Sequence, residues 1–167
     1  MTPYKTMFGS LASFQKGGVE VIHDNAKNYV FSNVFEVASK SKPYERVAVA
    51  KNFEYVIECA RAEGTSPWYS CAHDEFSLCM DGSVEVQFWK PDGATKLPGP
   101  ETQGAVQLSG KPAGKKMGRV VIGRGHMALL PTGSAYQFIA ATPSVLLIQT
   151  IQGKETVEKW SQICQIS

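Results

Sequence analysis

The sequence lacks the features that would place the chain in a membrane or on a nucleic acid. No apolar run approaches the length of about 20 residues that a bilayer-spanning helix needs. The net charge is only +2 over 167 residues, which is too small to indicate a polyanionic partner. We therefore expect neither nucleic acid nor membrane among the partners of this chain.

Cysteine is scarce, and its spacing forms no redox or zinc motif. The chain has Cys59, Cys71, Cys79 and Cys164, and no C-x-x-C pair occurs among them. The opening stretch MTPYKTMFGS also lacks the apolar segment of an export signal. Four reduced, mostly buried thiols in a cytoplasmic protein are the expectation.

The composition is that of a globular protein. Hydrophobic residues make up 43% of the chain and charged residues 19%. A chain of 167 residues is expected to form one domain, which we place over 1–167, with a core that needs no disulfide or metal to hold it.

Short apolar segments separated by turn residues predict an all-β fold of the barrel or jelly-roll type. The dipeptides Asp81-Gly82 and Thr142-Pro143 are expected to turn two hairpins. In 53–62, alternation places Tyr55, Ile57 and Cys59 inside and Glu58 outside, although a helix there remains an alternative. Strands are expected over 28–38, 44–52, 53–62, 76–80, 83–90, 118–122, 126–131, 135–141 and 144–152.

Helices are expected only near the two ends. In an N-terminal arm over 1–27, Ser10 is a suitable cap for a short helix over 10–16. A C-terminal helix is expected over 154–165, where apolar residues recur at helical spacing. Between them, residues 91–118 are rich in proline and glycine and predict one long loop.

Residues 64–82, GTSPWYSCAHDEFSLCMDG, resemble the first signature motif of the cupin superfamily of small β-barrels. In that motif a His-x-His pair precedes a Glu, and six residues separate the Glu from a Gly. Glu75 and Gly82 keep this spacing, but Tyr69 and Cys71 stand at the two histidine positions.

Residues 125–140, GHMALLPTGSAYQFIA, resemble the second cupin motif. Gly125, Pro131 and Gly133 fall in register, whereas Tyr136 takes the histidine position. In the superfamily the three histidines and the Glu hold a divalent metal, often Fe(II). Three of the four ligand positions are thus changed, and we expect no metal and no catalytic residue in this chain.

The changed positions still define a candidate pseudo-site lining the barrel, made of Tyr69, Cys71, His73, Glu75 and Tyr136. A buried Glu75 without a metal needs a donor, which the hydroxyl of Tyr69 or Tyr136 could supply. Because residues two apart on a strand share a face, Cys71, His73 and Glu75 also offer a shifted metal site as an alternative.

Longer stretches resemble a narrower family, the small subunit of two-subunit hydroquinone 1,2-dioxygenases. They are FGSLASFQKG, NYVFSNVFEVA, KPYERVAVAKNFEYVIE, RAEGTSPWYSCAHDEFSLCMDGSVEVQF, KPAGKKMGR and GHMALLPTGSAYQF. The resemblance implies cleavage of hydroquinone by Fe(II) and dioxygen to 4-hydroxymuconic semialdehyde, in aromatic degradation of the 4-nitrophenol type. It also implies an α2β2 heterotetramer in which a larger cupin-type subunit holds the iron.

Two other functions stay open on the sequence. The chain could be a self-sufficient small cupin enzyme, using either the shifted Cys71, His73 and Glu75 site or Glu75 as a base and a tyrosine as an acid. It could also be a non-catalytic module whose barrel holds a small ligand.

Overall fold

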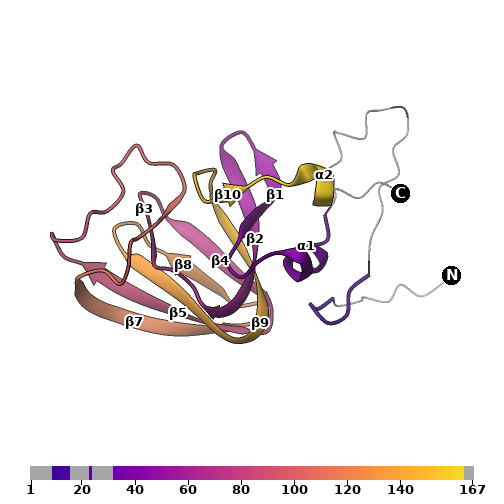
Figure 1. Cartoon of the computed structure of the whole chain (residues 1–167), viewed down its shortest axis with the longest axis horizontal. Helices are drawn as coiled ribbons and strands as arrows, with labels where there is room; N and C mark the ends of the chain where they lie inside the picture. Colours follow the sequence, from indigo (N-terminus) through magenta and orange to yellow (C-terminus); the bar gives the residue numbers. More distant parts are fainter. Residues whose placement is uncertain (1–8, 16–22, 24–31, 164–167) are drawn as a thin grey trace.

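The computed structural model describes residues 9–15, 23 and 32–163, and strands dominate that part of the chain (Figure 1). The predicted all-β class is confirmed, since the two described helices have only 7 and 4 residues. The elements are α1 (Val34–Lys40), β1 (Arg46–Asn52), β2 (Tyr55–Thr65), β3 (Tyr69–Cys71), β4 (Glu75–Asp81), β5 (Ser83–Pro91), β6 (Ala105–Gln107), β7 (Gly114–Gly123), β8 (Met127–Leu130), β9 (Ala135–Ile151), β10 (Thr156–Val157) and α2 (Trp160–Ile163).

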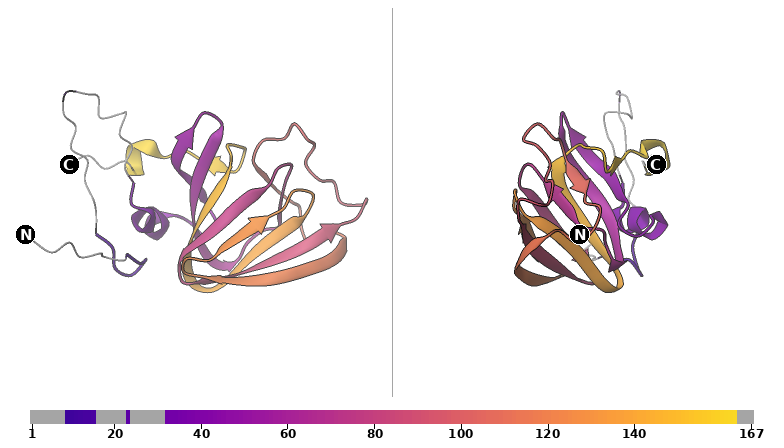
Figure 2. Two further views of the ribbon diagram at one scale, coloured as in Figure 1. Left: turned by 180° about the vertical axis from the view of Figure 1, so that it is seen from behind. Right: turned by 60° about the vertical axis from the view of Figure 1, so that its left-hand side comes forward.

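The long strand β9 organises the sheet. Its first residues pair with β3 and β5, and its last residues, 144–151, pair with β2 and β4. β9 therefore joins two layers, ordered β6-β3-β9-β5-β7 and β10-β1-β2-β9-β4-β8. Figures 1 and 2 show how these layers curl into a half-barrel around a common interior.

The interior of the half-barrel holds the main hydrophobic core. Alternate residues of β4, β5, β8 and β9 point into it, because side chains of a strand alternate between its two faces. A second cluster lies on the other side of β1, β2 and β9, where α1 packs. The main core contains Cys79, Val84, Val86, Leu130, Phe138, Leu146 and Ile148, and the second contains Val37, Ala38, Val47, Cys59 and Val145.

The N-terminal helix lies elsewhere than predicted. The expected strand over 28–38 is wrong from Val34 onward, where α1 begins, and 28–31 lie outside the described residues. The side chain of Asn33 caps α1 by accepting the Phe35 and Glu36 amides at 3.0 and 3.3 Å. No helix forms in 9–15, where Ser10 and Ser13 close a turn instead.

Both predicted hairpins are wrong, because each proposed turn lies along β9 rather than between paired strands. β4 and β5 do not pair with each other, and they follow the same edge of β9 one after the other. Gly82, between them, has φ of +77°, and a Cβ there would lie 2.2 Å from Ser144 Oγ. Thr142 and Pro143 sit within β9, which continues through them.

The predicted loop is shorter in the structure, and the C-terminal helix begins later than predicted. β5 extends to Pro91, β6 interrupts the loop, and β7 begins at Gly114, so the loop over 91–118 loses both ends to strands. The helix expected over 154–165 begins only at Trp160 and is described to Ile163, residues 164 and 165 lying outside the described part, and Thr156 instead pairs in parallel with Arg46. Neither of the helices described has the length and apolarity needed to cross a membrane.

Candidate functional site

The predicted pseudo-site residues come together at one end of the half-barrel interior. Tyr69 on β3 pairs directly with Tyr136 on β9, and their rings lie 5.8 Å apart. Glu75, the first residue of β4, is fully buried, and the Tyr136 hydroxyl donates a hydrogen bond to its Oε2. The prediction that a tyrosine would supply a donor to Glu75 is therefore confirmed for Tyr136.

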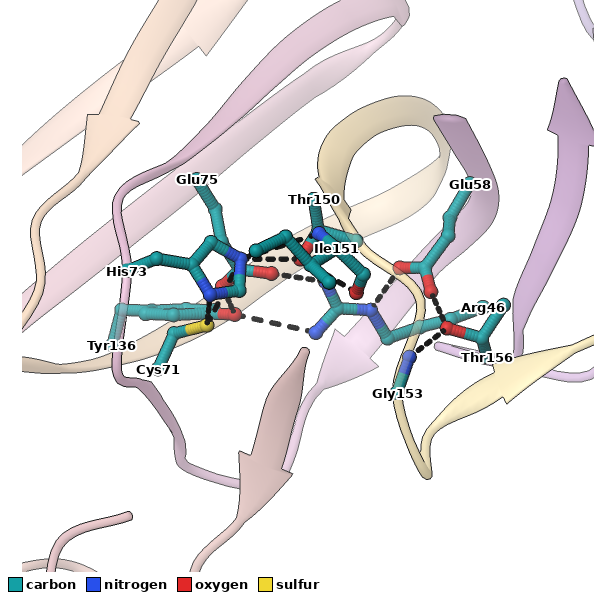
Figure 3. A network of polar contacts seen from close by, with 10 residues as sticks. All are labelled: Arg46, Glu58, Cys71, His73, Glu75, Tyr136, Thr150, Ile151, Gly153 and Thr156. Atoms are coloured by element: carbon teal, nitrogen blue, oxygen red, sulfur yellow. Dashed lines mark hydrogen bonds and ion pairs between the residues drawn. The ribbon is translucent and has the colours of Figure 1, made fainter. Parts of the chain in front are cut away.

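Cys71 and His73 complete the group (Figure 3). Cys71 Sγ lies 3.2 Å from His73 Nδ1. His73 Nε2 accepts the Ile151 amide at 3.2 Å and lies 3.1 Å from Thr150 Oγ1 and 3.4 Å from Cys71 Sγ. Because Nε2 is an acceptor, the proton of a neutral His73 ring belongs on Nδ1, facing the sulfur.

The centre of the site is a residue that the sequence did not single out, Arg46. Its Nε donates to Glu58 Oε2 at 2.5 Å, and its Nη2 donates to Glu75 Oε1 at 2.8 Å. Its Nη1 lies 3.2 Å from the Tyr136 hydroxyl, and the guanidinium faces the Tyr69 ring at 5.5 Å. Arg46, Glu58 and Glu75 are 3%, 1% and 0% exposed, so the whole ion-pair network is buried.

Glu58 was missed because the sides predicted for Tyr55, Ile57 and Glu58 in β2 are wrong, although Cys59 is buried as predicted. Tyr55 and Ile57 are 56% and 38% exposed, whereas Val56, Glu58 and Ala60 are buried. Both parities of this strand carry apolar residues, and the position of Glu58 between Ile57 and Cys59 was the available signal. In the structure Thr156 Oγ1 donates to Glu58 Oε1 at 2.6 Å, so the second carboxylate is also bound on both oxygens.

Burial sets the protonation of the side chains at the former ligand positions. Burial, followed by the charge of Glu75, raises the pKa of Tyr136 well above its usual range. The same two causes raise the pKa of Cys71 to about 12. Burial alone would lower the pKa of Arg46, but Glu58 and the other network partners raise it well above its usual value. At neutral pH the site therefore holds a phenol, a thiol and a fixed guanidinium.

These residues do not fit the iron that a cupin motif implies. Both oxygens of Glu75 already accept hydrogen bonds, and a guanidinium lies beside them. A phenol and a thiol with raised pKa are poor ligands for a hard divalent ion. The ligand atoms of Cys71, His73 and Glu75 do lie within 4.8 Å of one another, so the predicted shifted group is geometrically assembled.

Solved structures of one enzyme type match the chain over almost its whole length. Hydroquinone 1,2-dioxygenase from Sphingomonas sp. TTNP3, with 4-hydroxybenzoate bound, has a chain 58% identical to this one. The match covers 99% of both chains with a TM-score of 0.93. The chain belongs to the hydroquinone 1,2-dioxygenase family. A chain of hydroquinone 1,2-dioxygenase PnpCD, in complex with Cd²⁺ and 4-hydroxybenzonitrile, is 51% identical over 98% of both chains, with a TM-score of 0.89.

More distant matches bear on the fold alone. A second PnpCD chain, from a complex with Fe³⁺, is 12% identical and has a TM-score of 0.60; the match covers 84% of this chain and 39% of that one. A cupin-2 domain protein from Shewanella frigidimarina has 14% identity and a TM-score of 0.53, with coverage of 77% and 100%. These matches confirm the predicted cupin-type fold. No protein-family model and no curated protein sequence matched the chain.

Proposed function

We propose that this chain is the small, non-metal-binding subunit of an Fe(II)-dependent hydroquinone 1,2-dioxygenase. The observation that carries the proposal is the 58% identity over 99% of a hydroquinone 1,2-dioxygenase chain. The reaction would be cleavage of hydroquinone by dioxygen to 4-hydroxymuconic semialdehyde, with both oxygen atoms retained in the product. Iron would supply dioxygen activation, and it would be held by a different subunit.

Two further observations support the proposal that iron is held by another subunit and not by this chain. The PnpCD structures match this chain in two ways, once over a chain of similar length and once over 39% of a longer chain with a cupin-like part. In the present chain Arg46 engages Glu75 and Tyr136, the positions from which a cupin metal would be held. A larger cupin-type subunit carrying the iron, in an α2β2 heterotetramer, accounts for both.

The substrate class follows from the ligands of the relatives. The related structures bind 4-hydroxybenzoate and 4-hydroxybenzonitrile, which are both para-substituted phenols. We extend this class to the complex containing the present chain, in aromatic degradation of the 4-nitrophenol type. Cys59, Cys71 and Cys79 are free and buried, which suits the reducing cytoplasm as the place of action.

A second candidate function is favoured by one observation, the assembly of Cys71, His73 and Glu75 within 4.8 Å. In that case the chain itself would hold a metal and act alone. The proximity of Arg46 to Glu75 weighs against it, because a guanidinium repels a second cation at close range.

Purification of the tagged chain from its native host separates the two functions. The proposal expects a longer subunit in equal amount, iron that stays with that subunit after separation, and oxygen-dependent hydroquinone consumption only by the complex. The isolated chain, loaded with Fe(II) under anaerobic conditions and desalted, should retain no iron. About one iron per isolated chain, together with hydroquinone cleavage, would instead establish the self-sufficient enzyme.

A further inference from the structure

Arg46 sits where the two cupin motifs converge, although it belongs to neither. Its guanidinium reaches Glu75 of the first motif at 2.8 Å and the Tyr136 hydroxyl of the second at 3.2 Å. Its Nε donates a hydrogen bond to Glu58 Oε2 at 2.5 Å. This buried cation pairs with both carboxylates, which would otherwise be left unpaired inside the fold.

The group formed by Cys71, His73 and Glu75 lies directly against this cation. Ligands of a tetrahedral ion stand about 2.0–2.3 Å from the metal, and therefore roughly 3.3–3.8 Å from one another. Cys71 Sγ and His73 Nδ1 are already 3.2 Å apart, and all three ligand atoms fall within 4.8 Å. Small side-chain shifts would bring a thiolate, an imidazole and a carboxylate onto one borderline ion of the Zn²⁺ or Co²⁺ type.

Such an ion would have to share Glu75 with Arg46. Arg46 Nη2 lies 2.8 Å from Glu75 Oε1, and both residues are buried. A metal ion bound to this carboxylate would therefore lie close to the guanidinium. Repulsion between cations is strong where water is excluded.

We infer that Arg46 is the resident cation of this barrel, and that its guanidinium keeps divalent metal out of a latent three-ligand site made of Cys71, His73 and Glu75. The exclusion of metal by Arg46 holds whether or not the chain works beside a longer subunit. It also explains how the cupin scaffold keeps a buried Glu75 after losing its histidines.

The test replaces the guanidinium without changing the net buried charge. The double substitution Arg46→Met and Glu58→Gln removes one positive and one negative charge and leaves Glu75 free to bind. The full chain, wild type and double variant, is titrated with Co²⁺ under reducing, anaerobic conditions. Near-ultraviolet thiolate-to-cobalt absorption and equilibrium dialysis report binding.

The double variant should bind Co²⁺ with roughly 100-fold higher affinity than the wild type. This is the upper end of the change in metal affinity that residues next to the metal ligands usually cause. Adding Cys71→Ser should remove the thiolate band and so assign it to Cys71 rather than to another cysteine. Equal affinity in the wild type and the double variant would overturn the inference, because Arg46 would then exclude nothing.

A variant that is unfolded without metal still gives an answer. Binding at a native site drives folding, so Co²⁺ should restore the far-ultraviolet circular dichroism of the wild type together with the thiolate band. A double variant that gives no band, folded or unfolded, overturns the inference. The titration needs neither the longer subunit nor substrate, so its failure would leave the proposed function standing.

Discussion

Along β4 the buried side chains change from ionic to apolar within five residues. Glu75 and Cys79 are both 0% exposed, yet Glu75 joins the Arg46 network whereas Cys79 packs with the main hydrophobic core. The apolar part gains stability from the area and volume it buries, to which many neighbours contribute. The ionic part depends on each member separately, because removing one leaves the others charged and unpaired. The two parts should therefore respond differently to the same kind of substitution.

The largest effect is expected when the cation is removed alone. Arg46→Met leaves Glu58 and Glu75 as uncompensated buried carboxylates, which should lower the free energy of unfolding by about 3–5 kcal/mol. Urea denaturation of the full chain measures this change. The matched control is Arg119→Met, because Arg119 pairs with Glu85 at the surface, where a pair contributes about 1 kcal/mol or less. Similar losses in both variants would contradict the ionic interpretation of the interior.

On the apolar side, the size of the side chain should decide the outcome. Leu146 is fully buried in the main core, and Leu146→Ala should cost about 2–5 kcal/mol through the cavity that it creates. Leu146→Met, which keeps the volume, should cost less than about 1.5 kcal/mol. The same denaturation series measures both. If the two variants lost equal stability, packing would not be what this region depends on.

A smaller loss of stability is expected when only the hydrogen bond from Tyr136 to Glu75 is removed. Tyr136→Phe keeps the ring in contact with Tyr69 and removes the hydroxyl that donates to Glu75. A buried acceptor that loses a donor costs about 1–3 kcal/mol, and Arg46 still holds the other oxygen of Glu75. Phe138→Leu serves as the comparison on the apolar side, where no polar partner is lost. An unchanged urea midpoint for Tyr136→Phe would show that this hydrogen bond contributes nothing net.

The cupin scaffold could be predicted from the sequence, whereas the buried ionic network around Arg46 could not. The scaffold was predictable because Glu75, Gly82, Gly125, Pro131 and Gly133 keep a spacing that depends on local turn geometry. Gly82 illustrates the reason, since its positive φ and its contact with Ser144 leave no room for a side chain. The side chains named from the two motifs lie close to one another in the structure.

Arg46 and Glu58 could not be placed from the sequence, because each binds a residue far away in the chain, Glu75 for Arg46 and Thr156 for Glu58. β1 meets β2 and β10 through ladders, and a bulge lies between Ala48 and Ala50. Tyr55, Ile57 and Glu58 in β2 were assigned to the wrong sides because both parities of the strand carry apolar residues, and a shift of one residue exchanges the two faces. The expected hairpins failed for a related reason, since β9 is long enough to pair with successive strands on one edge.

A smaller effect is expected at alkaline pH, on the ionic side only. The pKa of Cys71 is raised from an ordinary 9.0 to about 12, so the folded chain keeps a proton that the unfolded chain loses. The stability that this provides is fully present below about pH 9 and is lost as the pH rises toward 12. Cys71→Ser should flatten this decline by at most about 1.4 kcal/mol per pH unit. Thermal unfolding at a series of alkaline pH values measures the slope, and identical slopes for wild type and variant would refute the assignment to Cys71.

The smallest effect is expected on catalysis itself, within the proposed complex. Glu75→Gln keeps the shape of the side chain but weakens its bonds to Arg46 and Tyr136, so it should reduce the yield of assembled complex. Turnover of hydroquinone per iron should stay unchanged, because the reacting atoms would lie in the longer subunit. His73→Asn, which alters the contacts with Cys71 and Thr150, is the matched variant and should behave in the same way.

Loss of a general base or a metal ligand typically lowers turnover by about two to four orders of magnitude. The decisive quantity is therefore turnover per iron in complexes of verified subunit ratio. A fall of about a hundredfold for Glu75→Gln, with iron content and assembly intact, would place catalytic chemistry in this barrel after all.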